Sequence, residues 1–431
     1  MRNIVLITLD SVRADHCSFM GYKRQTTPNL DKMAREGVYF QNAIAPGPRT
    51  IPSMPAIFTG KLMHFFNTDP FYGVVQNTRR HLRLYKTLAE ELSQRGYNTG
   101  AFCTNAYTSS YFGFNKGFDY FQDFLWSSSK SHQKVFERMI RGSKLFRYLR
   151  NVKNLLLKQE AFKSWESYYE DITNWVNQAK EPFFLWVFLL DTHLPWITPK
   201  RCRKWGNFFN MYYSGWKIFR LLNKQNFYIS EKLRNRLINA YDDSIYYADQ
   251  FVGKLHKDLK DFDPIFIIHS DHGEEFGERG YYGHNFPHLY EENLHVPLVI
   301  YNGDARQRIE KPMTLLNLPA IIMNIADNKP PFNSLSNKDW FLSKDFDYKR
   351  GKKIIALRMG KWKLIVGQGE IDELYNLEQD PNEQENLINE YPKVAEEMKR
   401  IVKSHIKQEE IKSIHDKVPK IRGLRSKRSF G

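Results

Sequence analysis

Several short stretches of the chain are continuously apolar and rich in β-branched and aromatic residues. Such runs are typical of strands in a parallel sheet, because helices cover both of its faces and bury every side chain. We therefore expect at least five buried strands. They are NIVLITL at 3–9, NTGAFCT at 98–104, FFLWVFLL at 183–190, PIFIIHS at 264–270 and VPLVIY at 296–301.

Amphipathic helical patterns alternate with these runs. The segment 27–37 opens with Thr27 and Pro28, a favourable N-cap and first-turn pair, and it stops at a glycine. Residues 86–96 also stop at a glycine, and 243–259 carries apolar residues at helical spacing. This alternation predicts an α/β fold built on a doubly wound sheet with helices on both faces.

Two segments interrupt the alternation within a main domain that we place at 1–345. The first, at about 126–180, is helical in pattern, and its residues 130–160 hold nine Lys or Arg against two acids. The second, at about 199–233, is aromatic and basic. Each insert is compatible with a lid, with a surface that contacts an anionic membrane peripherally, or with a solvated helix pair packed on the sheet.

The pattern changes near the C-terminus. The run IIALRMGKWKLIV predicts short strands and 392–409 predicts a helix, so we expect a small α+β subdomain at 346–410. A tail at 411–431 follows. From residue 417 it holds six basic residues and no acid.

Composition narrows the class of protein. The chain has 431 residues, 42% of them hydrophobic, which is enough for a large core, and its formal net charge of +16 favours an anionic partner. Three widely spaced cysteines give neither a disulfide framework nor a zinc-finger spacing. No signal peptide, membrane-length apolar window or nucleic-acid-binding module is visible. We expect a cytoplasmic protein, at most peripheral to a membrane, with no specific nucleic-acid partner.

Acids and imidazoles follow three of the predicted strands. Asp10 follows the first, Asp191-Thr192-His193 follows 183–190, and Asp271-His272-Gly273-Glu274 follows 264–270. Because the carboxyl ends of parallel strands share one edge of a sheet, these side chains are expected to meet there. Asp10, Asp271 and His272 suit one Mn²⁺, Zn²⁺ or Mg²⁺ ion better than Ca²⁺, which prefers oxygen ligands. The alternative is a helix N-cap for Asp10 and a turn for His272.

Eight motifs follow one another along the chain. They are SVRADH, YKRQTTPNLDKMAREGVYFQNAIAP, TIPSMPAIFTG, DTHLPW, YDDSIYYAD, SDHGEEFGERGYYGHNFPHLYEENLHVPL, RMGKWKLI and DELYNLEQDPNEQENL. In this order they resemble the sulfatase family of the alkaline phosphatase superfamily. The resemblance implies an alkaline-phosphatase-like mixed sheet and a metal-dependent ester hydrolase. It also implies an anionic ester substrate, such as a sulfated or phosphorylated glycan, lipid or small molecule.

The resemblance also assigns roles to residues. Thr50 stands at the position of the nucleophile, where it would also contact the ion, and Asp10, Asp271 and His272 match the metal ligands. His193 and His284 match positions that contact the bound anion or the leaving group, and His288 is a further candidate for binding substrate. The ion is expected to be Mn²⁺, Zn²⁺, Mg²⁺ or Ca²⁺.

Three positions depart from the family pattern. Thr50 replaces the cysteine or serine that true sulfatases oxidise to formylglycine, and a secondary alcohol cannot give that aldehyde. Met54 stands where the motif has arginine. Ser11 replaces the second acid of the usual Asp-Asp pair, and His272 replaces the usual asparagine. The loss of carboxylates and gain of imidazole shift the site away from Ca²⁺.

These departures leave several functions open. A nearby divalent cation lowers the pKa of an alcohol, which makes Thr50 a competent nucleophile toward phosphorus. A sulfated threonine would be hard to turn over, so the chemistry slightly favours phosphoesters. The alternatives are a sulfuric ester hydrolase that works without formylglycine, a transferase that moves a phospho group onto a glycan or lipid, and a catalytically silent binding protein.

Overall fold

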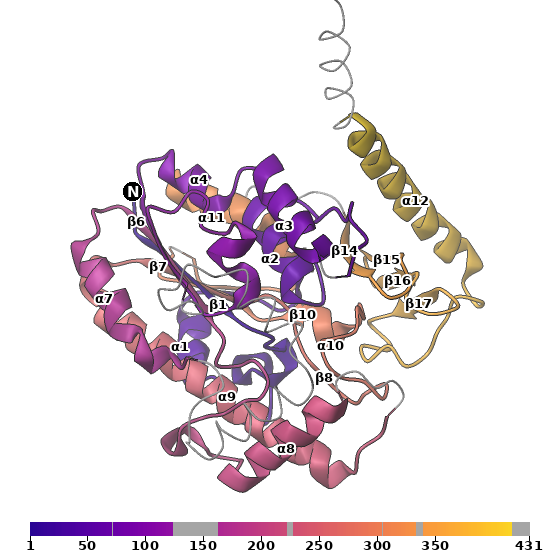
Figure 1. Ribbon diagram of the computed structural model, residues 1–431, viewed down its shortest axis with the longest axis horizontal. Coiled ribbons are helices and arrows are strands. Elements are labelled where there is room, and N and C mark those ends of the chain that lie inside the picture. Colours follow the sequence, from indigo (N-terminus) through magenta and orange to yellow (C-terminus); the bar gives the residue numbers. More distant parts are fainter. Residues whose placement is uncertain (71, 124–162, 222–226, 304, 333–338, 416–431) are drawn as a thin grey trace, which may run out of the picture.

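The computed structural model describes residues 1–431 except 71, 124–162, 222–226, 304, 333–338 and 416–431. Its centre is a mixed eight-stranded sheet in the order β12-β2-β11-β7-β1-β6-β4-β5 (Figure 1). The strands are β1 Ile4–Leu9, β2 Val38–Phe40, β4 Asn98–Cys103, β5 Tyr120–Asp123, β6 Phe183–Leu189, β7 Ile265–Ser270, β11 Leu298–Tyr301 and β12 Gln307–Ile309. The doubly wound mixed sheet expected from the sequence is confirmed.

Strand β1 forms the middle of the sheet, and every one of its residues is buried. It pairs in parallel with β6 on one side and β7 on the other. Its side chains alternate between two hydrophobic cores, with Ile4 and Leu6 in one and Val5, Ile7 and Leu9 in the other. Two-sided burial is the physical reason for the continuous apolar run.

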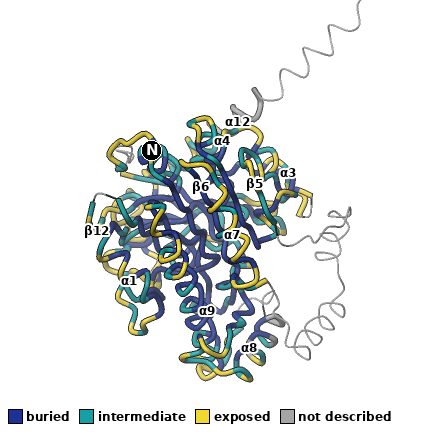
Figure 2. Tube along the Cα trace, turned by 90° about the vertical axis from the view of Figure 1, so that its left-hand side faces the viewer, coloured by how far each residue is buried: buried dark blue, intermediate teal, exposed yellow. Residues whose placement is uncertain are grey.

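Helices cover both faces of the sheet, and burial is concentrated between them (Figures 1 and 2). Residues of the first set of helices pack in the core that holds Ile4 and Leu6, and residues of the second set pack in the core that holds Val5. The first set is α2 Thr50–Thr59, α3 Tyr72–Leu84, α4 Leu88–Ser93 and α11 Leu318–Ala326. The second set is α1 Pro28–Glu36, α7 Tyr169–Gln178, α8 Phe208–Leu221 and α9 Glu231–Asp258.

The structure corrects the expectation for 296–301. This run is divided at Pro297 into β10 (His295–Val296), which pairs with β3 (Ala43–Ile44), and β11, which pairs antiparallel with β7. Proline has no N–H to donate to a ladder, so the chain changes sheets there. The third strand of the small sheet is β13, Met313–Thr314.

The expected inserts are seen only in part. Residues 126–162 of the first insert lie outside the described residues, as do 416–431 of the tail; the rest of the first insert includes α7, which packs on the sheet. The second insert contains α8, and its last residues begin α9. That helix starts at Glu231, after the cap Ser230, and so extends well before the expected 243. Its early residues Leu233, Leu237, Ala240 and Tyr241 are buried and lie at helical spacing, so the pattern was present there and was not recognised.

A second sheet at the C-terminus is formed by β14 Trp340–Asp347, β15 Lys352–Met359, β16 Trp362–Val366 and β17 Glu373–Asn376. The helix α12, Pro392–His415, packs on it through Ala395, Met398 and Val402. Strand β14 crosses position 345, where we placed the domain boundary, because it pairs along its whole length with β15. The helix expected at 392–409 is confirmed, and it extends to His415.

The C-terminal sheet is joined to the main domain by buried polar contacts. Lys363 is 1% exposed, and its Nζ lies 2.8 Å from both Glu291 Oε1 and Glu383 Oε1. Glu291 belongs to the short helix α10, Glu291–Leu294, next to β10. The backbone N–H of Lys344 also donates to Pro46 O. A buried lysine needs such paired carboxylates to offset the loss of hydration.

Two further findings bear on the expected location of the protein. Within the part of the chain that the structure describes, no helix is both long and apolar enough to cross a membrane. The three cysteines, Cys17, Cys103 and Cys202, are buried and unpaired with one another.

Gly37 directly follows α1, at a point where the chain passes very close to β11 of the main sheet. A Cβ at this position would lie 2.4 Å from Ile300 O, a backbone atom that cannot rotate away. We expect Gly37→Ala to lower the free energy of unfolding by about 1–3 kcal/mol. Gly303→Ala is the control, since a Cβ there meets nothing within 4 Å, and we expect a change within about 0.5 kcal/mol. Urea unfolding of both variants measures this, and equal stabilities would contradict the packing.

Candidate active site

The three strand ends named in the sequence analysis converge at one edge of the main sheet. Leu9 is in register with Leu189 of β6 and with Ser270 of β7. The residues that follow therefore leave the sheet side by side, and the N–H of Asp10 still donates to Leu189 O at 3.1 Å. Parallel pairing in this register is what brings Asp10 and Asp271 together.

Asp10, Asp271 and His272 form a compact buried cluster. One ligand atom from each lies within 4.8 Å of the others, and all three residues are 0% exposed. His272 Nε2 is 3.7 Å from Asp10 Oδ1 and 3.6 Å from Asp271 Oδ2. Within the described residues, neither of these two carboxylate oxygens has a hydrogen-bond partner. Buried carboxylate oxygens without partners are costly, so the donor set fits a divalent cation.

The raised pKa of Asp10 also supports a divalent cation in this cluster. Burial, and then the negative charge of Asp271, raise the pKa of Asp10 well above its usual value. Two carboxylates this close in a dry site cannot both stay ionised without a compensating positive charge. A divalent ion would supply that charge directly.

The tautomer of His272 follows from its contacts. Its Nδ1 is 2.8 Å from Gly273 O, and a carbonyl can only accept, so Nδ1 carries the proton. Nε2 is then left with its lone pair facing the carboxylates, as a metal ligand requires. Burial lowers the pKa of His272, which keeps the ring neutral.

Thr50 is the first residue of α2 and is 5% exposed. Its Oγ1 lies 3.2 Å from His272 Nε2, so its hydroxyl borders the cluster. The start of this helix is fixed by Ser53, whose Oγ donates to Asp271 O at 2.6 Å. Met54 is 0% exposed and packs in the core, so the position where the motif has arginine faces away from charge.

His193 and His284 lie beside the cluster. The ring centroid of His284 is 4.5 Å from that of His272 and 5.0 Å from that of His193. His284 Nδ1 is 3.1 Å from Glu274 Oε1. Burial, and then His193, lower the pKa of His284 to about 3, and burial raises the pKa of Glu274 to about 7. His284 thus lies between His193 and the cluster.

His288 is placed differently from the other candidates. Its Nδ1 lies 3.0 Å from Glu275 Oε1, and its ring packs against Tyr281 and Phe286. Among the described residues, none of its ring contacts is with His193, His272 or His284. The structure therefore does not bring His288 together with Thr50.

The sequence analysis missed Asn105. It follows β4, and its Nδ2 donates to Asp10 Oδ2 at 2.7 Å. Thr192 was named only as part of a cluster, and its Oγ1 donates to Asp10 O at 2.6 Å. Both residues follow strands that end at this edge of the sheet, so the strand-end rule could have found Asn105.

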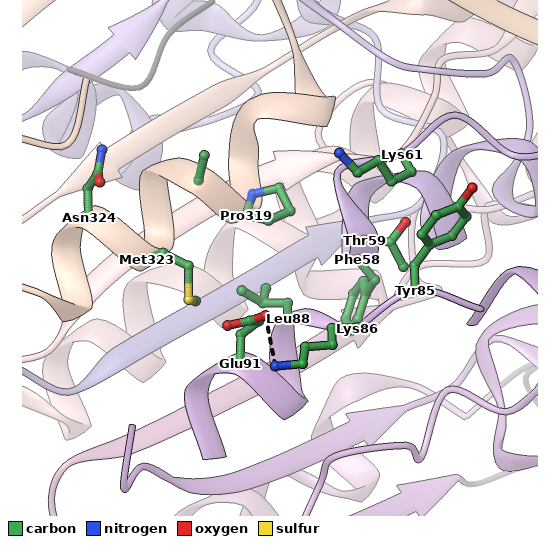
Figure 3. Close-up of a pocket in the computed structure, with 11 residues that line it drawn as sticks. Phe58, Thr59, Lys61, Tyr85, Lys86, Leu88, Glu91, Pro319, Met323 and Asn324 are labelled. Carbon is green, nitrogen blue, oxygen red and sulfur yellow. Dashed lines mark ion pairs between the residues drawn. The ribbon is translucent and has the colours of Figure 1, made fainter. Parts of the chain in front are cut away.

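A pocket elsewhere in the molecule is separate from this cluster. It has a volume of about 470 Å³ and lies between the end of α2, α4 and α11, where Lys86 pairs with Glu91 (Figure 3). None of its lining residues belongs to the cluster. It gives no support to any of the candidate catalytic residues.

Comparison with known proteins decides the family. The model of the sulfatase family matches residues 2–328. The chain belongs to the sulfatase family. It is similar to an arylsulfatase of Clostridium perfringens, with 26% identity over 93% of each chain.

Solved structures share this fold. The phosphonate monoester hydrolase of Agrobacterium radiobacter matches with a TM-score of 0.67 and 18% identity, over 95% of this chain and 96% of the other. The protein BT4656, in complex with its substrate D-glucosamine-2-N,6-O-disulfate, matches with a TM-score of 0.67 and 17% identity, over 95% and 98%. As a member of the sulfatase family, the protein is a hydrolase that acts on esters, and metal dependence is a property of this family.

The cluster can be tested by metal binding alone. We expect Mn²⁺ or Zn²⁺ to raise the melting temperature of the chelator-treated protein, because a ligand that binds only the folded state stabilises it. Asp271→Asn should abolish most of that rise. Asp261→Asn, an exposed aspartate before β7, is the control and should keep it. An equal rise in both variants would place the ion elsewhere.

Proposed function

We propose that this member of the sulfatase family is a metal-dependent hydrolase of phosphate esters in which Thr50 is the nucleophile. The observation that carries this proposal is the position of Thr50 Oγ1, 3.2 Å from His272 Nε2 and beside two unpaired carboxylate oxygens. Asp10, Asp271 and His272 would hold one divalent ion, with Thr50 as a further ligand. The ion would supply positive charge that lowers the pKa of the Thr50 hydroxyl.

The chemistry of threonine favours phosphorus over sulfur. Formylglycine releases sulfate by eliminating it from a hemiacetal, and Thr50 has no second hydroxyl on its Cβ for that elimination. A phosphothreonine can instead be opened by water attacking phosphorus, which releases inorganic phosphate and restores the Thr50 hydroxyl. The reaction thus has two displacements at phosphorus.

Other side chains near the cluster would position Asp10 and His284 or transfer protons. Asn105 and Thr192 hold Asp10 in place through its carboxylate and its backbone carbonyl. His193 and His284, whose ring centroids are 5.0 Å apart, would carry the proton that Thr50 loses and the proton that the leaving oxygen gains. Glu274 orients His284 through Nδ1.

A second candidate is a sulfuric ester hydrolase that uses Thr50 unmodified. It is favoured by the names of the relatives, which include an arylsulfatase and a structure with a sulfated sugar as substrate. A transferase that passes the phospho group from Thr50 to a glycan or lipid alcohol uses the same first displacement, and it differs only in the acceptor.

Thr50 is tested directly by substitution. We expect Thr50→Ala to lose at least about 10³-fold in kcat toward an aryl phosphate ester with Mn²⁺ or Zn²⁺ present, because the covalent route is removed. Thr50→Ser should retain activity. Thr59→Ala, at the other end of α2, is the control. Acid-quenched wild type should carry a phosphoryl group on Thr50 by mass spectrometry, and unchanged turnover in Thr50→Ala would remove this residue from the mechanism.

A substrate panel separates the candidate functions. We expect kcat/KM to be higher for an aryl phosphate monoester or diester than for the aryl sulfate with the same leaving group. A higher value for the sulfate, without any modified Thr50, would favour the second candidate. Product formation that needs an added alcohol would favour the transferase.

A further inference from the structure

An anionic ester that reaches Thr50 meets a site rich in acidic groups. Asp10, Asp271 and Glu274 are all 0% exposed and lie around the cluster. The nearby imidazoles carry no permanent charge. Met54 is apolar and fully buried, so it provides no cation. Beyond the charge that a divalent ion would supply, a permanent positive charge close to Thr50 must come from another residue.

The guanidinium of Arg13 is not available to bind an ester. Its Nη1 donates to Glu274 O at 3.0 Å and to Glu278 Oε1 at 2.8 Å, and its Nε and Nη2 both donate to Asp15. Every side-chain nitrogen of Arg13 is thus engaged by the protein. Two carboxylates neutralise its charge.

Arg49 directly precedes Thr50, and its guanidinium makes fewer hydrogen bonds to the protein than that of Arg13. Its Nε and Nη2 both lie 2.7 Å from Asp345 Oδ2, and Nη2 also donates weakly to Phe346 O at 3.4 Å. Among the described residues, none accepts a hydrogen bond from its Nη1. The side chain as a whole is 26% exposed, so it is partly accessible to a ligand.

Asp345 is a rigid support for Arg49. It is 1% exposed, it lies in β14 of the C-terminal sheet, and its Oδ1 accepts from the N–H of Phe346 at 2.7 Å. The backbone N–H of Phe346 thus fixes Oδ1 of Asp345, while Oδ2 holds the guanidinium of Arg49. A guanidinium held in this way loses little conformational entropy when it binds an oxyanion.

The position of Arg49 in the fold also relates it to the cluster. Arg49 is the N-cap of α2, and Thr50 is the first residue of that helix. The first turn of the same helix is tied to the cluster, because Ser53 Oγ donates to Asp271 O at 2.6 Å. Arg49 therefore lies at the end of α2 that adjoins the cluster.

We propose that Arg49 is an anion-binding subsite that holds a non-bridging oxygen of the ester next to Thr50, with Asp345 of the C-terminal sheet as its positioning residue. This inference rests on the proposed function of Thr50. The guanidinium replaces the charge that is absent at Met54, and it matches the geometry of a phosphoryl or sulfuryl group. The C-terminal sheet thereby contributes to the active site without contacting the substrate.

The test measures anion binding and turnover separately. We expect Arg49→Ala to raise the dissociation constant of inorganic phosphate, and KM for the ester, by about 10–100-fold, which corresponds to the loss of a charged hydrogen bond. Arg49→Lys should recover part of the loss, and added guanidinium ion should partly rescue Arg49→Ala. Asp345→Asn should raise the same constants by less than Arg49→Ala, because it releases Arg49 without removing it.

Arg350→Ala is the matched control. Arg350 follows β14 in the same sheet and pairs with the exposed Glu370, so its loss should leave phosphate binding unchanged. Phosphate binding measured by calorimetry needs no turnover. If the wild type hydrolyses no ester while binding still depends on Arg49, the function of Thr50 fails and the subsite stands. If Arg49→Ala and Arg49→Lys both bind phosphate as the wild type does, the subsite is wrong.

Discussion

The structure depends on two buried carboxylates held at the ends of neighbouring parallel strands. Asp10 and Asp271 follow β1 and β7, and both side chains are completely buried. Burying two like charges a few ångströms apart is unfavourable unless a cation and fixed donors compensate them. Backbone N–H groups of Ser11 and His272 donate to Asp271, and Asn105 donates to Asp10. The remaining oxygens face each other and His272, which leaves a place for one ion.

The surrounding elements fix this place in position. Ser53 ties the first turn of α2 to the backbone of Asp271, so the helix that carries Thr50 is attached to the strand end that carries Asp271 and His272. The C-terminal sheet holds the other side of the same helix start through Asp345 and Arg49. It is also bound to α10 by the buried Lys363. The subdomain and the main domain therefore form one support for the site.

The departures from the family motif can be interpreted from the positions of these residues in the structure. Met54 lies in the hydrophobic core and contributes packing where the family motif has a charge. Thr50 keeps a hydroxyl at the cluster but cannot form the aldehyde on which sulfate release depends. His272 brings a neutral nitrogen ligand in place of an amide oxygen, which suits a softer ion than Ca²⁺. Thr50 is the basis of the proposal that the site acts on phosphate esters, and His272 is the basis of the expectation of a transition-metal or zinc ion.

The sequence by itself determined the sheet, the strand ends and the candidate metal-binding residues. Strands buried on both faces must be continuously apolar, and ligands gather where parallel strands end, so Asp10, Asp271 and His272 could be named from position alone. The antiparallel direction of β11 and the attachment of β14 could not be predicted, since short apolar runs carry no sign of their partners.

Only the tertiary structure decided which polar side chains share the site. It brought Asn105 to Asp10 and Arg49 to Asp345, and it paired His288 with Glu275 away from Thr50. Arg49 and Asp345 are separated by almost the whole catalytic domain in the chain. Contacts of that kind depend on how two sheets dock, which local sequence patterns do not encode.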